Sequence, residues 1–353
     1  MVERCTEEEE AMLVAERTET PDAAQVPTQS IMKALTVPEY GSADVMRFQD
    51  VEVPSIGAGE VLVRVRAASV SAGDVHLLTG TPYLVRLAYG LTRPKHRIAG
   101  QNLAGVVEAV GPGVTTLKPG DEVFGQLHGA FAEYARAREG ELAPKPPSLT
   151  FEQAASMPDS ATTALQALRD AGRLQRGQRV LINGASGGVG TFAVQIAKAM
   201  GAHVTAVCST RHVERVRSIG ADEVIDYTRD DYARRTGRFD VMLDLVGRRA
   251  PAESRAVLAP KGTFVACAGA PDGMWLGPIV WMLKVMLAGM FASQRFTSFL
   301  TRPRREDLLA LTELVEAGAV TPVIEHTYPL REAAEAVRHV AGGHAQGKTV
   351  ITI

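Results

Sequence analysis

The sequence predicts a two-domain α/β protein in which a β-barrel precedes a doubly wound parallel sheet. From Met32 to about Pro147, short Val-rich segments alternate with Gly and Pro, which is typical of a small barrel or sandwich. After a Pro-rich break at Ala143–Thr150, apolar strands alternate with helical segments. That alternation indicates parallel βαβ units. A glycine cluster, Asn183–Gly190, follows the first of these strands.

Each predicted element has a local pattern. In the first domain the strands lie within residues 60–70, 102–114 and 119–127. In the second domain, strands and helices follow one another along the chain. They are helices within 151–172, a strand in 178–186, a helix in 188–201, a strand in 203–210, a helix in 211–220, and strands in 222–227, 239–247 and 262–269. Residues 347–353 form a last strand that returns to the first domain.

The composition limits the classes of function. The chain has 353 residues, 46% hydrophobic and 22% charged, with a net charge of -2, so it is long enough for two globular domains. A net charge of this sign and size does not predict the basic patch that nucleic-acid binding requires. The three cysteines, Cys5, Cys208 and Cys267, have no CxxC spacing. They predict neither a disulfide framework nor a thiolate zinc site, and they favour a cytoplasmic location.

The first 31 residues differ from the rest. They are acidic, with a Glu run from Glu7 to Glu10, followed by Pro, Thr and Gln. A signal peptide needs a basic start and an apolar stretch, and a transit peptide is poor in acids. We therefore expect a disordered acidic extension.

The glycine cluster predicts a dinucleotide site, because it lies between a strand and a helix. Its glycines permit a tight turn that lets backbone N–H groups approach a pyrophosphate, and the helix N-terminus adds partial positive charge. A tight turn that binds nothing is the alternative.

The next strand indicates the cofactor. It ends in Ser209, Thr210 and Arg211, without the Asp or Glu that holds the ribose 2′-hydroxyl of NAD. Arg211 can pair with a 2′-phosphate, and the two hydroxyls can donate to it. This predicts NADPH. In the alternative interpretation, Ser209 caps a helix and Arg211 is a surface charge.

Four stretches carry a resemblance to the medium-chain dehydrogenase/reductase superfamily, and most of all to its zinc-independent quinone oxidoreductases, the zeta-crystallin-like branch. They are "MKALTVPEYGSADVMRF", "AASVSAGDVHLLTG", "GQNLAGVVEAVG" and "LINGASGGVG". The resemblance implies a GroES-like β-barrel catalytic domain at 32–150 and 300–353. It also implies a Rossmann cofactor domain at 151–299, a homodimer and a small lipophilic substrate.

The resemblance also exposes a missing metal site. Zinc-dependent members have Gly-His-Glu where this chain has Gly100-Gln101-Asn102, and a Cys three residues before an Asp where this chain has Ser71 before Asp74. Because Ser, Gln and Asn are poor zinc ligands, no metal is predicted. Zinc-independent members often carry Asn at the Ser71 position, so this chain departs from their pattern there.

Without zinc, oxidation of a simple alcohol lacks the Lewis acid that stabilises an alkoxide. Reduction of an already polarised acceptor depends less on such a Lewis acid. We expect hydride transfer from NADPH to a quinone or a related electron-poor carbonyl compound. One alternative is reduction of an activated C=C bond, as in a 2-alkenal or enoyl reductase. Another is a cofactor-binding structural or partner protein with low turnover.

The resemblance assigns roles to individual residues. The catalytic candidates are Ser71 and Tyr83, and Tyr83 would donate a proton or else only line the pocket. We expect His76 to be a barrel histidine and Asp74 a structural acid. The cofactor candidates are Thr163 near the nicotinamide; Ser186, Gly187, Gly188 and Val189 at the pyrophosphate; Ser209, Thr210, Arg211 and Tyr227 at the 2′-phosphate; and Val246 and Ala268 along the cofactor.

An apolar segment, Trp275–Ser293, contains Lys284 and a Met stripe at helical spacing. We expect a helix that covers the cofactor domain or a subunit interface, because charge at the centre of a membrane span is costly. A Met-rich wall for a lipophilic substrate is an alternative. Peripheral membrane contact is not favoured.

Overall fold

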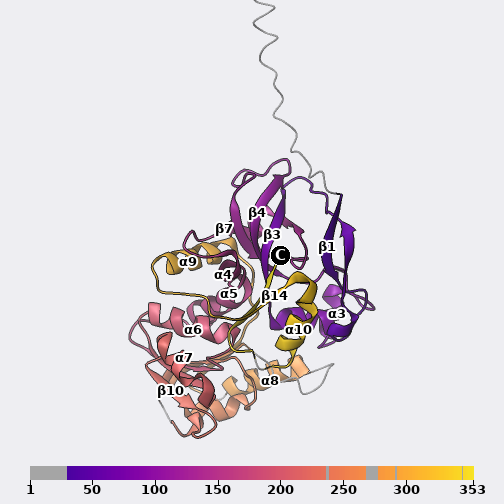
Figure 1. Ribbon diagram of the computed structural model, residues 1–353. Helices are drawn as coiled ribbons and strands as arrows, with labels where there is room; N and C mark the ends of the chain where they lie inside the picture. The colour runs from indigo at the N-terminus through magenta and orange to yellow at the C-terminus, as the bar shows by residue number, and fades with distance from the viewer. Residues whose placement is uncertain (1–29, 236–237, 268–276, 291, 344) are drawn as a thin grey trace, which may run out of the picture.

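The computed structural model describes residues 30–235, 238–267, 277–290, 292–343 and 345–353. Its strands form two large sheets and a small one (Figure 1). The small sheet pairs β1 with β2 in antiparallel register. These two strands span Ile31–Thr36 and Arg47–Glu52.

The first large sheet has seven strands, and its path runs β14-β15-β3-β4-β5-β7, with β6 paired to β3. Its strands are β3 (Glu60–Val70), β4 (Asn102–Val110), β5 (Glu122–Gln126), β6 (Tyr134–Arg138), β7 (Leu142–Pro144), β14 (Ile324–Pro329) and β15 (Lys348–Thr352). Side chains of these strands, among them Val63, Leu103 and Phe124, are fully buried. Through β14 and β15, this sheet brings the C-terminal strands of the chain beside β3.

The second large sheet is parallel, with the order β10-β9-β8-β11-β12-β13. Its strands are β8 (Arg179–Asn183), β9 (His203–Cys208), β10 (Glu223–Asp226), β11 (Phe239–Asp244), β12 (Leu258–Ala266) and β13 (Arg295–Ser298). In chain order this is 3-2-1-4-5-6, the doubly wound order of dinucleotide-binding sheets. The predicted fold, a GroES-like barrel domain plus a Rossmann sheet, is confirmed.

The helices cover both sheets. They are α2 (Ala72–Thr79), α3 (Leu84–Tyr89), α4 (Phe151–Ala155), α5 (Pro158–Gln166), α6 (Gly188–Ala199), α7 (Val213–Ser218), α8 (Gly277–Met290), α9 (Arg305–Glu316) and α10 (Ala333–Ala341). Short 3-10 turns lie at Ala43–Val45, Glu139–Glu141, Thr210–His212, Tyr232–Arg234, Pro251–Ala256 and Leu330–Glu332, and a π turn at Ala167–Ala171. The exact domain boundaries stay a prediction.

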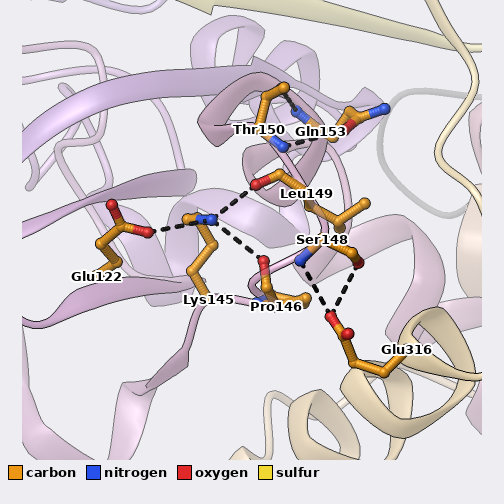
Figure 2. A network of polar contacts seen from close by, with 8 residues as sticks. All are labelled: Glu122, Lys145, Pro146, Ser148, Leu149, Thr150, Gln153 and Glu316. Carbon is orange, nitrogen blue, oxygen red and sulfur yellow. Dashed lines mark hydrogen bonds and ion pairs between the residues drawn. The ribbon is translucent and has the colours of Figure 1, made fainter.

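The Pro-rich break is held on both sides by polar contacts (Figure 2). Lys145 Nζ donates to the carbonyls of Leu149 (2.7 Å) and Pro146 (3.1 Å) and pairs with Glu122 at 3.1 Å. Glu316, on α9, accepts from the backbone amide and the hydroxyl of Ser148. The connection between the sheets is thus anchored to both parts of the chain.

Helix α8 lies against the edge of the parallel sheet (Figure 1). Trp281 and Val285 are buried in one cluster with Phe264. The Met stripe, Met282, Met286 and Met290, lies on the opposite, exposed face. Within the described residues, none of the helices has the length and apolar character that crossing a membrane requires.

Candidate functional site

The turn after β8 approaches its neighbours so closely that only glycine fits. Gly184 has a φ of +89°, which favours glycine. A Cβ on Gly190 would lie 2.1 Å from the carbonyl oxygen of Gly184. The N-cap residue of α6 is Gly187, so no side chain caps the helix. The backbone N–H groups of the first helical turn are therefore available to a ligand. The residues present therefore fit a dinucleotide pyrophosphate.

The predicted cofactor residues that follow β8, β9, β10 and β11 lie at one edge of the parallel sheet, because the carboxyl ends of parallel strands share that edge. Val246 follows β11 and lies beside the turn, since its Cγ2 is 2.9 Å from a Cβ built on Gly184. Ser186, Gly187, Gly188 and Val189 form the turn and the start of α6. Ala268 lies outside the described residues. The roles of these residues stay predictions.

The end of β9 holds the candidate 2′-phosphate residues. Ser209 makes no side-chain cap bond to the following turn, and Arg211 is exposed. Tyr227 is 59% exposed at the end of the neighbouring β10, where its amide donates to the carbonyl of Cys208 at 3.0 Å. Ser209, Arg211 and Tyr227 thus lie at one exposed edge.

Asp226 was missed by the sequence analysis. Its carboxylate accepts hydrogen bonds from Thr210 (2.5 Å) and Thr228 (2.8 Å). These bonds, those of Thr210 foremost, lower the pKa of Asp226. A carboxylate does therefore lie near the end of β9, and the hydroxyl of Thr210 is already engaged. Its register position opposite Cys208 could have signalled this contact.

Ser71 and Gln101 meet at one buried carboxylate. The backbone amide and the hydroxyl of Ser71 donate to Asp74 Oδ2 at 2.7 and 3.0 Å, and Gln101 Nε2 donates to Asp74 Oδ1 at 3.4 Å. Burial raises the pKa of Asp74 to about 6, although the Ser71 hydrogen bonds oppose that shift. The expected structural acid is therefore also a titratable group within the site.

The second amide has a different partner. Asn102 is fully buried, and its Oδ1 accepts the backbone amide of Asp159 at 3.0 Å. Serine and two amides stand where a zinc-dependent member would place its thiolate, imidazole and carboxylate. Around Asp74 this donor set does not fit a catalytic zinc ion.

Lys348 and Asp159 complete a charged cluster that sequence reasoning missed. Lys348 is 2% exposed, and its Nζ donates to the carbonyl of Val70 (3.2 Å) and to Ser160 Oγ (3.0 Å). Burial lowers the pKa of Lys348, while Asp159 and Asp74 raise it. Burial also raises the pKa of Asp159. No local motif links positions this far apart in the chain.

This cluster touches the cofactor turn at Gly188. A Cβ on Gly188 would lie 3.2 Å from Lys348 Cδ and 3.3 Å from the carbonyl oxygen of Gly347. The first residues of β15 therefore pack directly against the start of α6. Ser71, Lys348 and the glycine turn form one continuous region at the junction of the two sheets.

Tyr83 and Thr163 have other partners. The guanidinium of Arg86 lies 4.6 Å from the ring centroid of Tyr83 and 4.5 Å from that of Tyr40. The hydroxyl of Thr163 lies 2.6 Å from that of Thr301. Their proposed contacts with the reactants stay predictions.

A pocket opens beside Asp74. Its apolar wall includes Leu77, Ile98 and Phe131, and its polar groups include the stacked imidazoles of His96 and His128, 4.0 Å apart. Burial lowers the pKa of His128 to about 4, so this ring is neutral at pH 7. The exposed His76 was expected in the barrel but lies on α2, with Nδ1 2.8 Å from the carbonyl oxygen of Thr81.

Two family models match the chain. An alcohol dehydrogenase GroES-like domain matches residues 57–147, and a zinc-binding dehydrogenase model matches residues 219–351. The chain is 37% identical to the mitochondrial NAD(P)H oxidoreductase RTN4IP1 of Mus musculus, over 92% of this chain and 90% of that protein. It is 32% identical to the 2-methylene-furan-3-one reductase of Solanum lycopersicum, over 94% and 81%.

Among solved structures, the quinone oxidoreductase from Coxiella burnetii superposes with a TM-score of 0.81 at 28% identity, covering 92% of this chain and 99% of that one. The mouse relative is named as mitochondrial, which contradicts the expected cytoplasmic location. The cysteine pattern and the acidic N-terminal composition were the basis of that expectation, and neither determines a compartment.

Proposed function

The chain belongs to the medium-chain dehydrogenase/reductase superfamily, in its zinc-independent quinone oxidoreductase branch, and is an NAD(P)H-dependent oxidoreductase; from this premise we propose that it uses NADPH to reduce quinones without a catalytic metal. The observation that carries the proposal is the network in which Ser71 and Gln101 donate to Asp74; by the resemblance, Ser71 and Gln101 stand where zinc-dependent members carry zinc ligands. A buried hydrogen-bonded network of this kind can orient a polar acceptor or pass a proton.

The protein's own residues divide the work. The glycine turn and the first amides of α6 would hold the pyrophosphate, and Ser209, Arg211 and Tyr227 the 2′-phosphate. A bound reduced nicotinamide supplies hydride. The apolar wall beside Asp74 would exclude water and accept a lipophilic ring, and Ser71, held by Asp74, or Tyr83 would supply the proton.

Preference for NADPH has support and one opposing feature. At the end of β9, Arg211 is exposed and the half-buried Ser209 makes no side-chain cap bond. Asp226 opposes an added phosphate charge, but its hydrogen bonds to two threonines and Arg229, 3.7 Å away, moderate that charge. We therefore expect binding of the 2′-phosphate to depend on Arg211 more than on Thr210.

Reduction of an activated C=C bond is the second candidate, because the tomato relative is named as a reductase of a methylene-furanone. Both reactions need hydride at one atom and a proton at another. The proposed network around Asp74 can serve either. A homodimer stays a prediction.

The test is steady-state consumption of NADPH with an ortho-quinone and a 2-alkenal in parallel, with and without a chelator. We expect quinone turnover that the chelator does not change, with NADH a poorer donor. Turnover of the alkenal alone would move the protein to the double-bond reductases. Tight NADPH binding without turnover of either acceptor would contradict both assignments and support a cofactor-binding protein.

A further inference from the structure

A second group of metal-binding side chains lies where β14 meets α10. Glu325 and His326 belong to β14, and His339 belongs to α10. One potential ligand atom from each of the three lies within 4.8 Å of the others. Glu325 Oε2 is 3.3 Å from His339 Nε2, and Glu325 Oε1 is 3.7 Å from His326 Nε2. The carboxylate is nearly buried, with its side chain 10% exposed.

The strand is deformed at this point. Neighbouring residues of a regular strand point to opposite faces, so Glu325 and His326 would not share a side. The pairing of β14 with β15 shifts between Ile324 and His326. A bulge of this kind inserts one residue and re-aims a side chain. Here it brings both side chains of β14 to His339.

The three side chains lie close enough together to share one metal ion. In a tetrahedral zinc site with metal–ligand bonds of about 2.1 Å, neighbouring ligand atoms lie about 3.4 Å apart. A strong charge-assisted hydrogen bond between nitrogen and carboxylate is shorter, about 2.8 Å. The separations of 3.3 Å (Glu325 Oε2 to His339) and 3.7 Å (Glu325 Oε1 to His326) are longer than such a hydrogen bond and close to the tetrahedral value. With one ligand atom taken from each residue, the three atoms lie within 4.8 Å of one another, so a small movement of the exposed His326 would close the set around an ion.

Backbone groups around the carboxylate fix its orientation. The amide of Gln346 donates to Glu325 Oε2 at 2.6 Å. The carbonyl of Gln346 accepts from Arg215 Nη1, on α7, at 2.7 Å. Such outer contacts are typical of metal sites, where they orient the ligands. They also connect the group to a helix of the parallel sheet.

We propose that Glu325, His326 and His339 bind one zinc ion, with water as the fourth ligand, and that this ion stabilises the corner between β14 and α10. Imidazole and carboxylate are suitable zinc ligands, in contrast to the groups around Asp74. The site is structural, so the reaction proceeds without it. Because its ligands must be deprotonated, zinc affinity falls as the pH falls.

The experiment uses the untagged full chain, freed of metal by dialysis against a chelator. Zinc is added, excess is removed, and bound zinc is counted by elemental analysis alongside the thermal unfolding midpoint. We expect one zinc ion per chain and a higher midpoint. The double variant His326→Asn/His339→Asn should lose the zinc and the rise in midpoint. His96→Asn, which removes a histidine from the stacked His96–His128 pair far from this site in the sequence, should keep both.

Glu325→Gln preserves an acceptor for Gln346 and serves if the double variant fails to fold. We expect its zinc affinity to fall at least tenfold. Zinc uptake well below one per chain, or uptake that neither variant lowers, would overturn the proposal. NADPH turnover is measured in the same samples below the unfolding range. Turnover lost with the zinc would overturn the structural role, whereas failure to reduce any acceptor bears only on the proposed function.

Discussion

The glycine turn after β8 and the charged cluster around Ser71 adjoin each other, yet they are built in opposite ways. The turn comes from consecutive residues, and its fit depends on backbone atoms that a Cβ would strike. The cluster depends on side chains, and Lys348 reaches Val70 across 278 positions of the chain. A local motif can specify the first kind of site, whereas only the complete fold assembles the second.

Replacing Lys348 tests the cluster most severely. In Lys348→Met, the buried carboxyls of Asp74 and Asp159 lose their cation, and breaking a buried charge set costs about 3–5 kcal/mol. Chemical denaturation at pH 7 measures the loss in free energy of unfolding. Lys118→Met, at an exposed lysine, should cost less than about 0.5 kcal/mol. Equal small losses would show that the charges contribute nothing to stability.

The turn is tested by adding one methyl group at each of two glycines. Gly190→Ala forces a Cβ within 2.1 Å of a carbonyl oxygen, and overpacking of this kind costs about 1–3 kcal/mol. NADPH binding, followed by fluorescence titration, should weaken as well. In Gly187→Ala the nearest atom is 3.5 Å away, so stability should be nearly unchanged. If both variants behaved alike, close approach would not be the reason for the glycine.

A pH series sharpens the role of Asp74. Its folded pKa, about 6, lies above its ordinary value, so the folded state binds the proton more tightly than the unfolded chain does. The contribution of this group to stability is therefore greatest near pH 4 and falls as the pH rises through 6. Asp74→Asn removes that dependence, so its stability relative to the wild type should improve between pH 4 and pH 7.

Unfolding of both proteins at several pH values measures this difference. The exposed Asp50→Asn serves as the control. Parallel curves for Asp74→Asn and wild type would mean that Asp74 titrates normally. In that case the cluster would not hold a proton near neutral pH.

The smallest expected effect concerns the predicted 2′-phosphate site, where side chains rather than backbone groups would bind the cofactor. Arg211→Ala should raise the KM for NADPH about tenfold, equivalent to about 1.4 kcal/mol, and leave the KM for NADH unchanged. Arg217→Ala, whose guanidinium pairs with Glu214, is the matched control. An equal rise for both cofactors would contradict 2′-phosphate recognition by Arg211.

The sequence predicted the elements best where they are regular. The strand expected at 60–70 spans Glu60–Val70 in the structure, and in its middle the predicted alternation holds, with Val63 and Val65 buried and Arg64 and Arg66 exposed. The glycine turn was also predicted, together with the family. Asp159 and Lys348 were missed, because their partners lie far away in the chain. Asp226 was missed although Thr228, one of its partners, lies only two residues away. The Met stripe was predicted as a helix face, but only its neighbours Trp281 and Val285 show which side is buried.

Strand β15 also has a consequence for the order in which the protein is made. It lies between β14 and β3 in the first large sheet, yet residues 348–352 are translated after every strand of the parallel sheet. During synthesis the parallel sheet can form as a unit. Until β15 is made, the edge of β3 at residues 67–70, which pairs with β15 in the finished protein, stays open. An open edge of this kind can pair with a strand of another chain.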